Sequence, residues 1–120
     1  MWAGTTINVL FGSADGMFLT LIAVMVLDSI TGVFCAVIRK KRSGRMGMRA
    51  FAKKMGILCI VSLATLIEQN ILETTAIRSA VILYYISSEG LSIFENLSKI
   101  GVPIPKKLKD VLDKVSEKDS

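Results

Sequence analysis

A 22-residue apolar segment, residues 17–38, constrains this chain more than any other feature, because it runs directly into a cluster of basic residues. Twenty-two helical residues are about 33 Å long, enough to cross a ~30 Å hydrocarbon core. The segment contains twelve Leu, Ile, Val or Phe residues. Their insertion free energies, about −0.3 to −0.6 kcal/mol each, outweigh the ~3 kcal/mol cost of placing Asp28 in mid-membrane. We therefore predict a first transmembrane helix over 17–38, not a cleavable signal peptide, because the basic residues follow the apolar run.

The basic cluster has eight cations and no acid within residues 39–54, and apolar stretches flank it on both sides. A nucleic-acid-binding patch would need a soluble fold to carry it, and these flanks cannot provide one, so we expect no nucleic-acid partner. Residues 39–50 are instead predicted as a cytoplasmic loop that obeys the positive-inside rule and lies against anionic headgroups. The surface residues assigned to this cluster are Arg39, Lys40, Lys41, Arg42, Arg45, Arg49, Lys53 and Lys54.

A second membrane segment is predicted over residues 51–72. Its unbroken apolar run, residues 55–67, has only 13 residues, and that length alone also fits a re-entrant or core helix. The longer segment gives a full span in which Lys53 and Lys54 extend towards the headgroups at one end.

A third segment, residues 76–97, is amphipathic and has one polar helical stripe. Such a helix spans a membrane only if the stripe is buried against protein or water, and otherwise lies in the interface. We favour spanning, which places the N-terminus outside and the C-terminus in the cytoplasm. The stripe consists of Ser88, Glu89, Ser92, Glu95 and Asn96.

The two ends of the chain are short. Residues 1–16 are predicted as an N-terminal interfacial segment in which Trp2 is an anchor. Pro103 and Pro105 end the third helix, and residues 103–118 form an amphipathic tail that packs on the bilayer or on a neighbour. The predicted fold is thus a single all-α membrane domain with three transmembrane helices.

Composition argues against an enzyme. The chain has no His and only two Cys, so the usual bases and metal ligands are missing, and two Cys cannot form a disulfide framework. Residues 44–47, Gly-Arg-Met-Gly, lack the spacing of a phosphate-binding loop. We expect no catalytic residue, no cofactor and no metal.

Two acidic residues lie deep in the predicted spans. Asp28 precedes Arg39 by 11 residues and Glu89 precedes Lys99 by 10, so both are about 15 Å from the cytoplasmic boundary. Carboxylates at this depth mark water-lined paths, or they join helices by bonding Ser, Thr or Asn on a neighbour. Both alternatives remain open here.

Small and hydroxyl residues suggest where helices meet. Gly32 and Ala36 form a small-xxx-small step on the first helix, and Ser62 and Thr65 lie on a thin polar stripe of the second. Arg78 is expected at the outer interface, in a weak exposed pair with Glu73.

Three short motifs resemble the phage holin family, which also covers toxin-secretion holins of Gram-positive bacteria. They are residues 27–32 (Leu-Asp-Ser-Ile-Thr-Gly) followed by the basic cluster and 54–56 (Lys-Met-Gly), residues 88–97, and residues 101–108. The match is collinear over roughly residues 20–115. The family usually has Asn where this chain has Ser88, before the Glu of the second motif.

The resemblance implies a small inner-membrane protein of a phage or prophage, not an enzyme. Such proteins oligomerise and open lesions that release an endolysin or a toxin, without specific binding of that cargo. The alternatives are a small ion channel or transporter subunit, and a non-permeabilising antiholin or scaffold. The residues that the resemblance carries over as motif positions are Asp28, Thr31, Gly32, Glu89, Ser92, Glu95 and Asn96.

Overall fold

The long apolar helix begins where the sequence supplies a cap. In the computed structural model, which describes residues 2–12, 15–40, 44–72 and 76–118, the Asp15 carboxylate accepts a hydrogen bond from the Phe18 backbone N–H at 2.9 Å. This bond satisfies one of the free N–H groups at the start of α2 (Gly16–Ile38). The helix ends with Lys40 in the left-handed conformation, at φ 57°.

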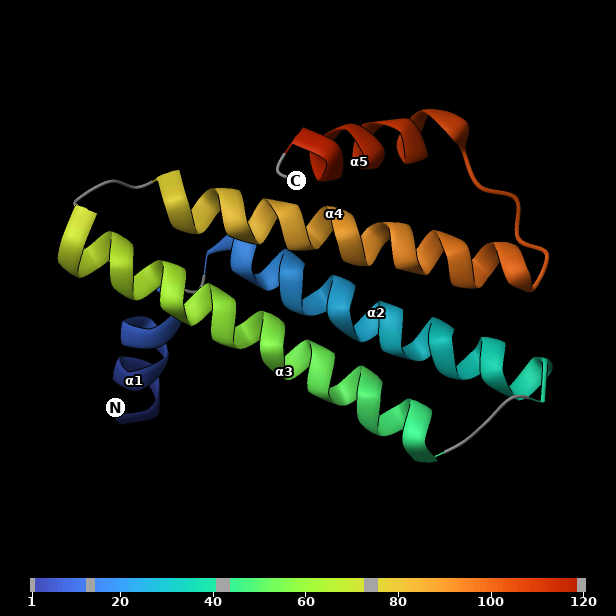
Figure 1. The fold of residues 1–120 in the computed structure, drawn as a ribbon, viewed down its shortest axis with the longest axis horizontal. Helices are drawn as coiled ribbons and strands as arrows, with labels where there is room; N and C mark the ends of the chain where they lie inside the picture. The colour runs from blue at the N-terminus through green and yellow to red at the C-terminus, as the bar shows by residue number, and fades with distance from the viewer. Residues whose placement is uncertain (1, 13–14, 41–43, 73–75, 119–120) are drawn as a thin grey trace.

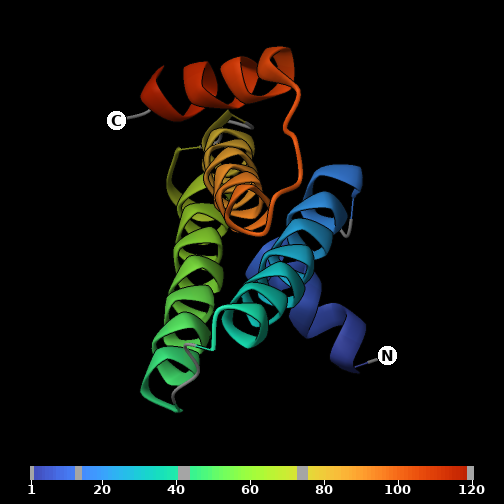
Figure 2. The ribbon, with the colours of Figure 1, turned by 90° about the vertical axis from the view of Figure 1, so that its right-hand side faces the viewer.

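Three long helices form the body of the molecule (Figure 1). α2 runs in the same direction as α4 (Ala76–Lys99), and α3 (Gly44–Ile67) runs in the opposite direction. α1 (Trp2–Phe11) lies near the C-terminal end of α3. α5 (Lys106–Lys118) folds back along α4 on the side away from α2 and α3 (Figure 2). A π-helical turn, η1 (Glu68–Leu72), follows α3 directly.

The predicted all-helical fold is confirmed for the described residues, which include no strand. Two helices are long and apolar enough to cross a membrane, α2 and the segment Gly47–Ile71. α4 is not one of them, so its transmembrane placement stays a prediction. It is nevertheless the central helix, in contact with α2, α3 and α5.

The bundle has a small apolar core and a large apolar exterior. Leu21, Val61 and Ile82 are fully buried, one from each long helix. Outward-facing residues on α2 and α3 are also apolar, as lipid tails would favour and water would not. They include Leu19, Val26, Leu27, Ile30, Val33, Phe34, Val37, Phe51, Ile60 and Leu63.

The basic segment differs from the predicted loop. α3 already begins at Gly44, so residues 44–50 are helical. Arg39, Lys40, Arg49 and Lys53 are exposed. Lys41 and Arg42 lie outside the described residues, and so does Glu73.

Candidate functional site

A cluster of three charged side chains, which we call the charged cluster, joins the three long helices. Lys54 Nζ on α3 lies 2.8 Å from Asp28 Oδ2 on α2 and 3.2 Å from Glu89 Oε1 on α4. The side chains of Asp28, Lys54 and Glu89 are 11%, 14% and 1% exposed. Lys54 thus supplies a counter-charge to two carboxylates in the bundle interior.

Asn96 continues the cluster along α4. Its amide Nδ2 donates to Asp28 Oδ1 at 3.2 Å and to Thr31 Oγ1 at 3.1 Å. The Thr31 hydroxyl in turn donates to the Leu27 carbonyl at 2.9 Å. Asp28 is therefore held from α3 by an ion pair and from α4 by an amide, which fixes the α2–α4 contact at this level.

Lys54 lies inside the bundle, whereas the sequence predicted it at the membrane surface. It turns inward because two buried carboxylates attract it more strongly than the headgroup region can, given their low-dielectric surroundings. A signal was present in the sequence. Lys54 is in helical register with Ile57, Val61 and Thr65, which form the buried stripe of α3.

The structure brings together four of the predicted residues: Asp28, Thr31, Glu89 and Asn96. A fifth, Gly32, faces Asn96, because a Cβ there would lie 3.7 Å from the Asn96 amide nitrogen. A sixth, Ser92, lies within hydrogen-bonding distance of the Asp28 carboxylate. Ala36 and Ser88 are half-buried.

Three other predicted residues lie away from the charged cluster. Glu95 is exposed and pairs with Lys99 at 3.3 Å. Thr65 is buried, and its hydroxyl donates to the Val61 carbonyl of its own helix at 2.8 Å. Ser62 is half-buried on α3. None of the three belongs to the charged cluster.

The end of the bundle near α1 is tied by Arg78, which the sequence analysis wrongly expected to be exposed. Its guanidinium donates to the Phe11 carbonyl at 2.6 Å and to Asp15 Oδ2 at 3.0 Å. Gly12, at φ +75°, makes room for it, because a Cβ there would lie 2.6 Å from Arg78 Nε. The Phe18 N–H and the Arg78 guanidinium together hold the pKa of the Asp15 carboxyl below its ordinary value.

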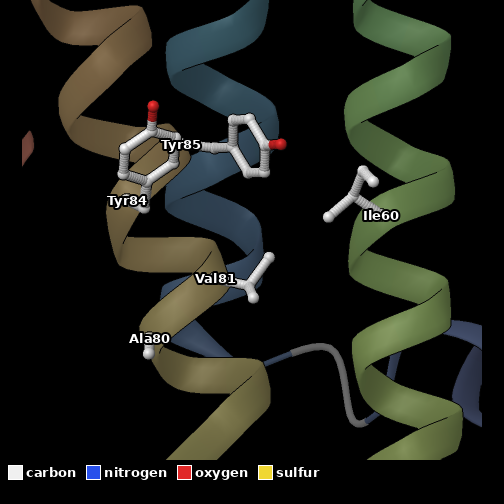
Figure 3. A pocket seen from close by; sticks show the side chains of 5 residues that line it. All are labelled: Ile60, Ala80, Val81, Tyr84 and Tyr85. Atoms are coloured by element: carbon white, nitrogen blue, oxygen red, sulfur yellow. The ribbon is translucent and has the colours of Figure 1, made fainter. Parts of the chain in front are cut away.

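A shallow apolar groove of about 260 Å³ lies between α3 and α4 (Figure 3). Ile60 lines it from α3, and Val81, Tyr84 and Tyr85 line it from α4. None of its lining residues is charged. Within the described residues, no group of three or more His, Cys, Asp or Glu is placed to hold a metal ion.

The charged cluster is incompletely satisfied. Glu89 Oε2 and the Ser87 hydroxyl are buried without a hydrogen-bond partner among the described residues. One ammonium also faces two carboxylates. An unpaired carboxylate oxygen in a dry interior is costly, and water or rearrangement would relieve that cost. The charged cluster therefore joins the helices, but hydration of Glu89 Oε2 would lower its free energy.

Apolar outward faces around a buried charged cluster define a small helical membrane protein whose helices are joined by polar side chains. The chain matches the bacteriophage holin family over residues 5–117. Because the match covers most of its length, the chain belongs to that family, which is not a family of enzymes. The predicted family is confirmed.

Several relatives align along nearly the whole chain. A probable holin of Bacillus phage phi105 is 35% identical over 117 residues, which cover 92% of this chain and 86% of that protein. A 14.9 kDa protein encoded in the nagH 3′ region of Clostridium perfringens is also 35% identical, over 96% and 88%. YqxH of Bacillus subtilis is 34% identical, over 88% and 75%. No solved structure matches the chain.

Proposed function

We propose that this protein is a holin that oligomerises in the bacterial cytoplasmic membrane and opens lesions large enough to release an endolysin or a toxin. The charged cluster of Asp28, Lys54 and Glu89 carries the proposal. A protein that only anchors in lipid has no need of three charged groups between its helices, since such groups are expensive there and generally functional. Family membership supports the same conclusion.

In the single chain, Lys54 pairs with both Asp28 and Glu89 of the same chain. Association of several copies lets the polar stripe of α4 leave its intramolecular partners and face other copies or water. Once water enters, Asp28, Lys54 and Glu89 are each solvated, and the need for mutual pairing disappears. Each solvated subunit makes solvation of its neighbour easier, so the opening is cooperative.

The proposed topology has three spans, α2, α3 with η1, and α4. The N-terminus is outside and the C-terminus is in the cytoplasm. The exposed cations Arg39, Lys40, Arg49 and Lys53 then lie on the cytoplasmic side, where anionic headgroups attract them. The cargo passes through the lesion without a dedicated binding site.

Glu89→Gln tests the proposal. It removes one carboxylate from the charged cluster, so that Lys54 and Asp28 form a balanced pair. Membrane insertion should be preserved, and the onset of lysis should change by a clear fraction of the wild-type delay. The readout is culture turbidity after induction in cells that also express an endolysin. Glu95→Gln is the matched control, because Glu95 is exposed on the same helix and pairs with Lys99.

Onset times that are equal for Glu89→Gln and wild type would remove the charged cluster from the mechanism. Membrane fractionation of both strains shows that the comparison is between equal amounts of inserted protein. If induction of the wild-type chain releases no endolysin at all, the holin function itself is contradicted.

A further inference from the structure

The C-terminal helix α5 rests on α4 at a glycine. A Cβ at Gly90 would lie 2.9 Å from Leu112 Cδ1 and 4.0 Å from Leu112 Cγ, so the Leu112 side chain occupies the place that a larger residue at position 90 would need. Leu112 and Val115 are partly buried in this contact. α5 thereby covers α4 on the side opposite to α2 and α3 (Figure 2).

Only part of the apolar face of α5 is used in that contact. Leu108 and Val111 remain 49% and 56% exposed. At 100° per residue, the apolar face of α5 spans about 100°, with lysines at both borders and acidic residues on the far side. The border lysines are Lys107, Lys109 and Lys114, and the acidic residues are Asp110 and Asp113. This distribution is typical of helices that lie in a bilayer interface, with lysines at the headgroups.

The docked position of α5 conflicts with a membrane-spanning α4. Gly90 precedes Lys99, the last residue of α4, by nine residues, so Leu112 contacts α4 about 14 Å from its cytoplasmic end. With α4 across the membrane, the docked α5 would carry Lys109 and Asp113 into the hydrocarbon core, where charged groups are strongly disfavoured. A spanning α4 therefore requires α5 to leave Gly90.

We propose that α5 binds the anionic cytoplasmic surface of the bilayer through its Leu108–Val111 face, in competition with its docking on Gly90 of α4. The inference rests on the proposed function, because it takes α4 to span the membrane in the permeabilising state. Anionic lipid is the partner that fits, since α5 has five lysines against three acidic residues and a half-exposed apolar face beside them. Docked α5 marks the chain before α4 crosses the membrane, and lipid-bound α5 allows α4 to cross it.

A disulfide between positions 90 and 112 tests this competition. The full-length variant Gly90→Cys/Leu112→Cys is made in a Cys35→Ser/Cys59→Ser background. A Cβ at position 90 would lie 4.0 Å from Leu112 Cγ, and a cysteine at position 112 places its sulfur close to that Cγ position, so the two sulfurs can meet. Disulfide formation is measured by gel mobility in phosphatidylcholine vesicles and in vesicles with 30 mol% phosphatidylglycerol. We expect formation to be slower by about tenfold with the anionic lipid, because lipid-bound α5 is away from Gly90. Equal rates in the two lipids would overturn the proposal.

Dye and dextran release by the same variant separates this inference from the holin function. The oxidised protein should release no more than protein-free vesicles, and reduction should restore release to the level of the Cys35→Ser/Cys59→Ser background. If the oxidised protein releases as much as the reduced protein, α5 docking does not control α4, although the holin function stands. If the wild-type chain itself releases nothing, the holin function has failed.

Discussion

A lysine at the border of an apolar helix can extend to the headgroups or turn inward to a carboxylate. At Lys54 the inward direction prevails because two acidic residues from different helices lie within 3.2 Å of its ammonium group. Its neighbour Lys53 is exposed. The two lysines are adjacent in the sequence, and their different positions around the helix turn Lys54 towards the bundle interior and Lys53 towards the outside.

Lys54→Met should destabilise the protein by about 3–5 kcal/mol, because it leaves two buried carboxylates without their counter-charge. The three side chains are no more than 14% exposed, so solvent screens the charges little. Thermal unfolding in detergent, followed by circular dichroism, measures the loss. Lys53→Met is the control and should stay within about 0.5 kcal/mol of wild type. Equal effects at the two positions would show that the Lys54 ion pairs do not stabilise the fold.

Asp15 acts both as helix cap and as partner of Arg78, and two variants separate these roles. Asp15→Asn keeps a capping oxygen for the Phe18 N–H but loses the ion pair, whereas Asp15→Ala loses both. We expect Asp15→Ala to be less stable than Asp15→Asn by about 1 kcal/mol. Equal thermal midpoints would argue against the cap.

The pH dependence of Asp15 follows from its lowered pKa. A carboxyl with a lowered pKa in the folded state stabilises the fold fully above its unfolded pKa, near 4, and this contribution disappears as the pH falls through the folded value. Wild type should therefore lose stability relative to Asp15→Asn below about pH 4. Parallel curves of thermal midpoint against pH would contradict this assignment.

At the scale of elements, hydropathy was sufficient to predict the helical fold, and helical periodicity revealed the polar stripe of α4. Hydropathy could not predict the return of α5 onto α4, because that contact depends on Leu112 meeting the missing side chain of Gly90. The same limitation applied to Arg78, whose partners Phe11 and Asp15 are more than 60 residues away in the chain. Contacts between distant segments leave no periodic trace in a single sequence.

Gly32→Leu tests the contact between α2 and α4. The Cβ of a substituted residue has room, but a leucine side chain would collide with Asn96, whose amide holds Asp28 and Thr31. Overpacking of this kind costs about 1–3 kcal/mol. Gly56→Leu is the matched control, since no atom lies within 4 Å of a Cβ at Gly56. Thermal unfolding in detergent compares them, and a Gly32→Leu midpoint no lower than that of Gly56→Leu would contradict the contact.

At the scale of the whole molecule, the chain combines an outer surface suited to lipid with an interior that holds charge. α4 takes part in both the interior and the surface of the bundle. Its Glu89 and Asn96 contact the charged interior, and α5 packs on its opposite side. Family membership could be predicted from three short motifs in the sequence. The link between Asp28 and Glu89 through a single lysine required the structure.

Release of size-graded dextrans from vesicles tests the central claim, that this charged bundle opens into a large lesion when copies gather. Purified full-length protein is reconstituted at increasing density in vesicles loaded with a small dye and with dextrans of increasing mass. We predict that release rises steeply above a threshold density and includes dextrans as large as a folded hydrolase. Release of the small dye alone at every density, or no release at all, would contradict the account.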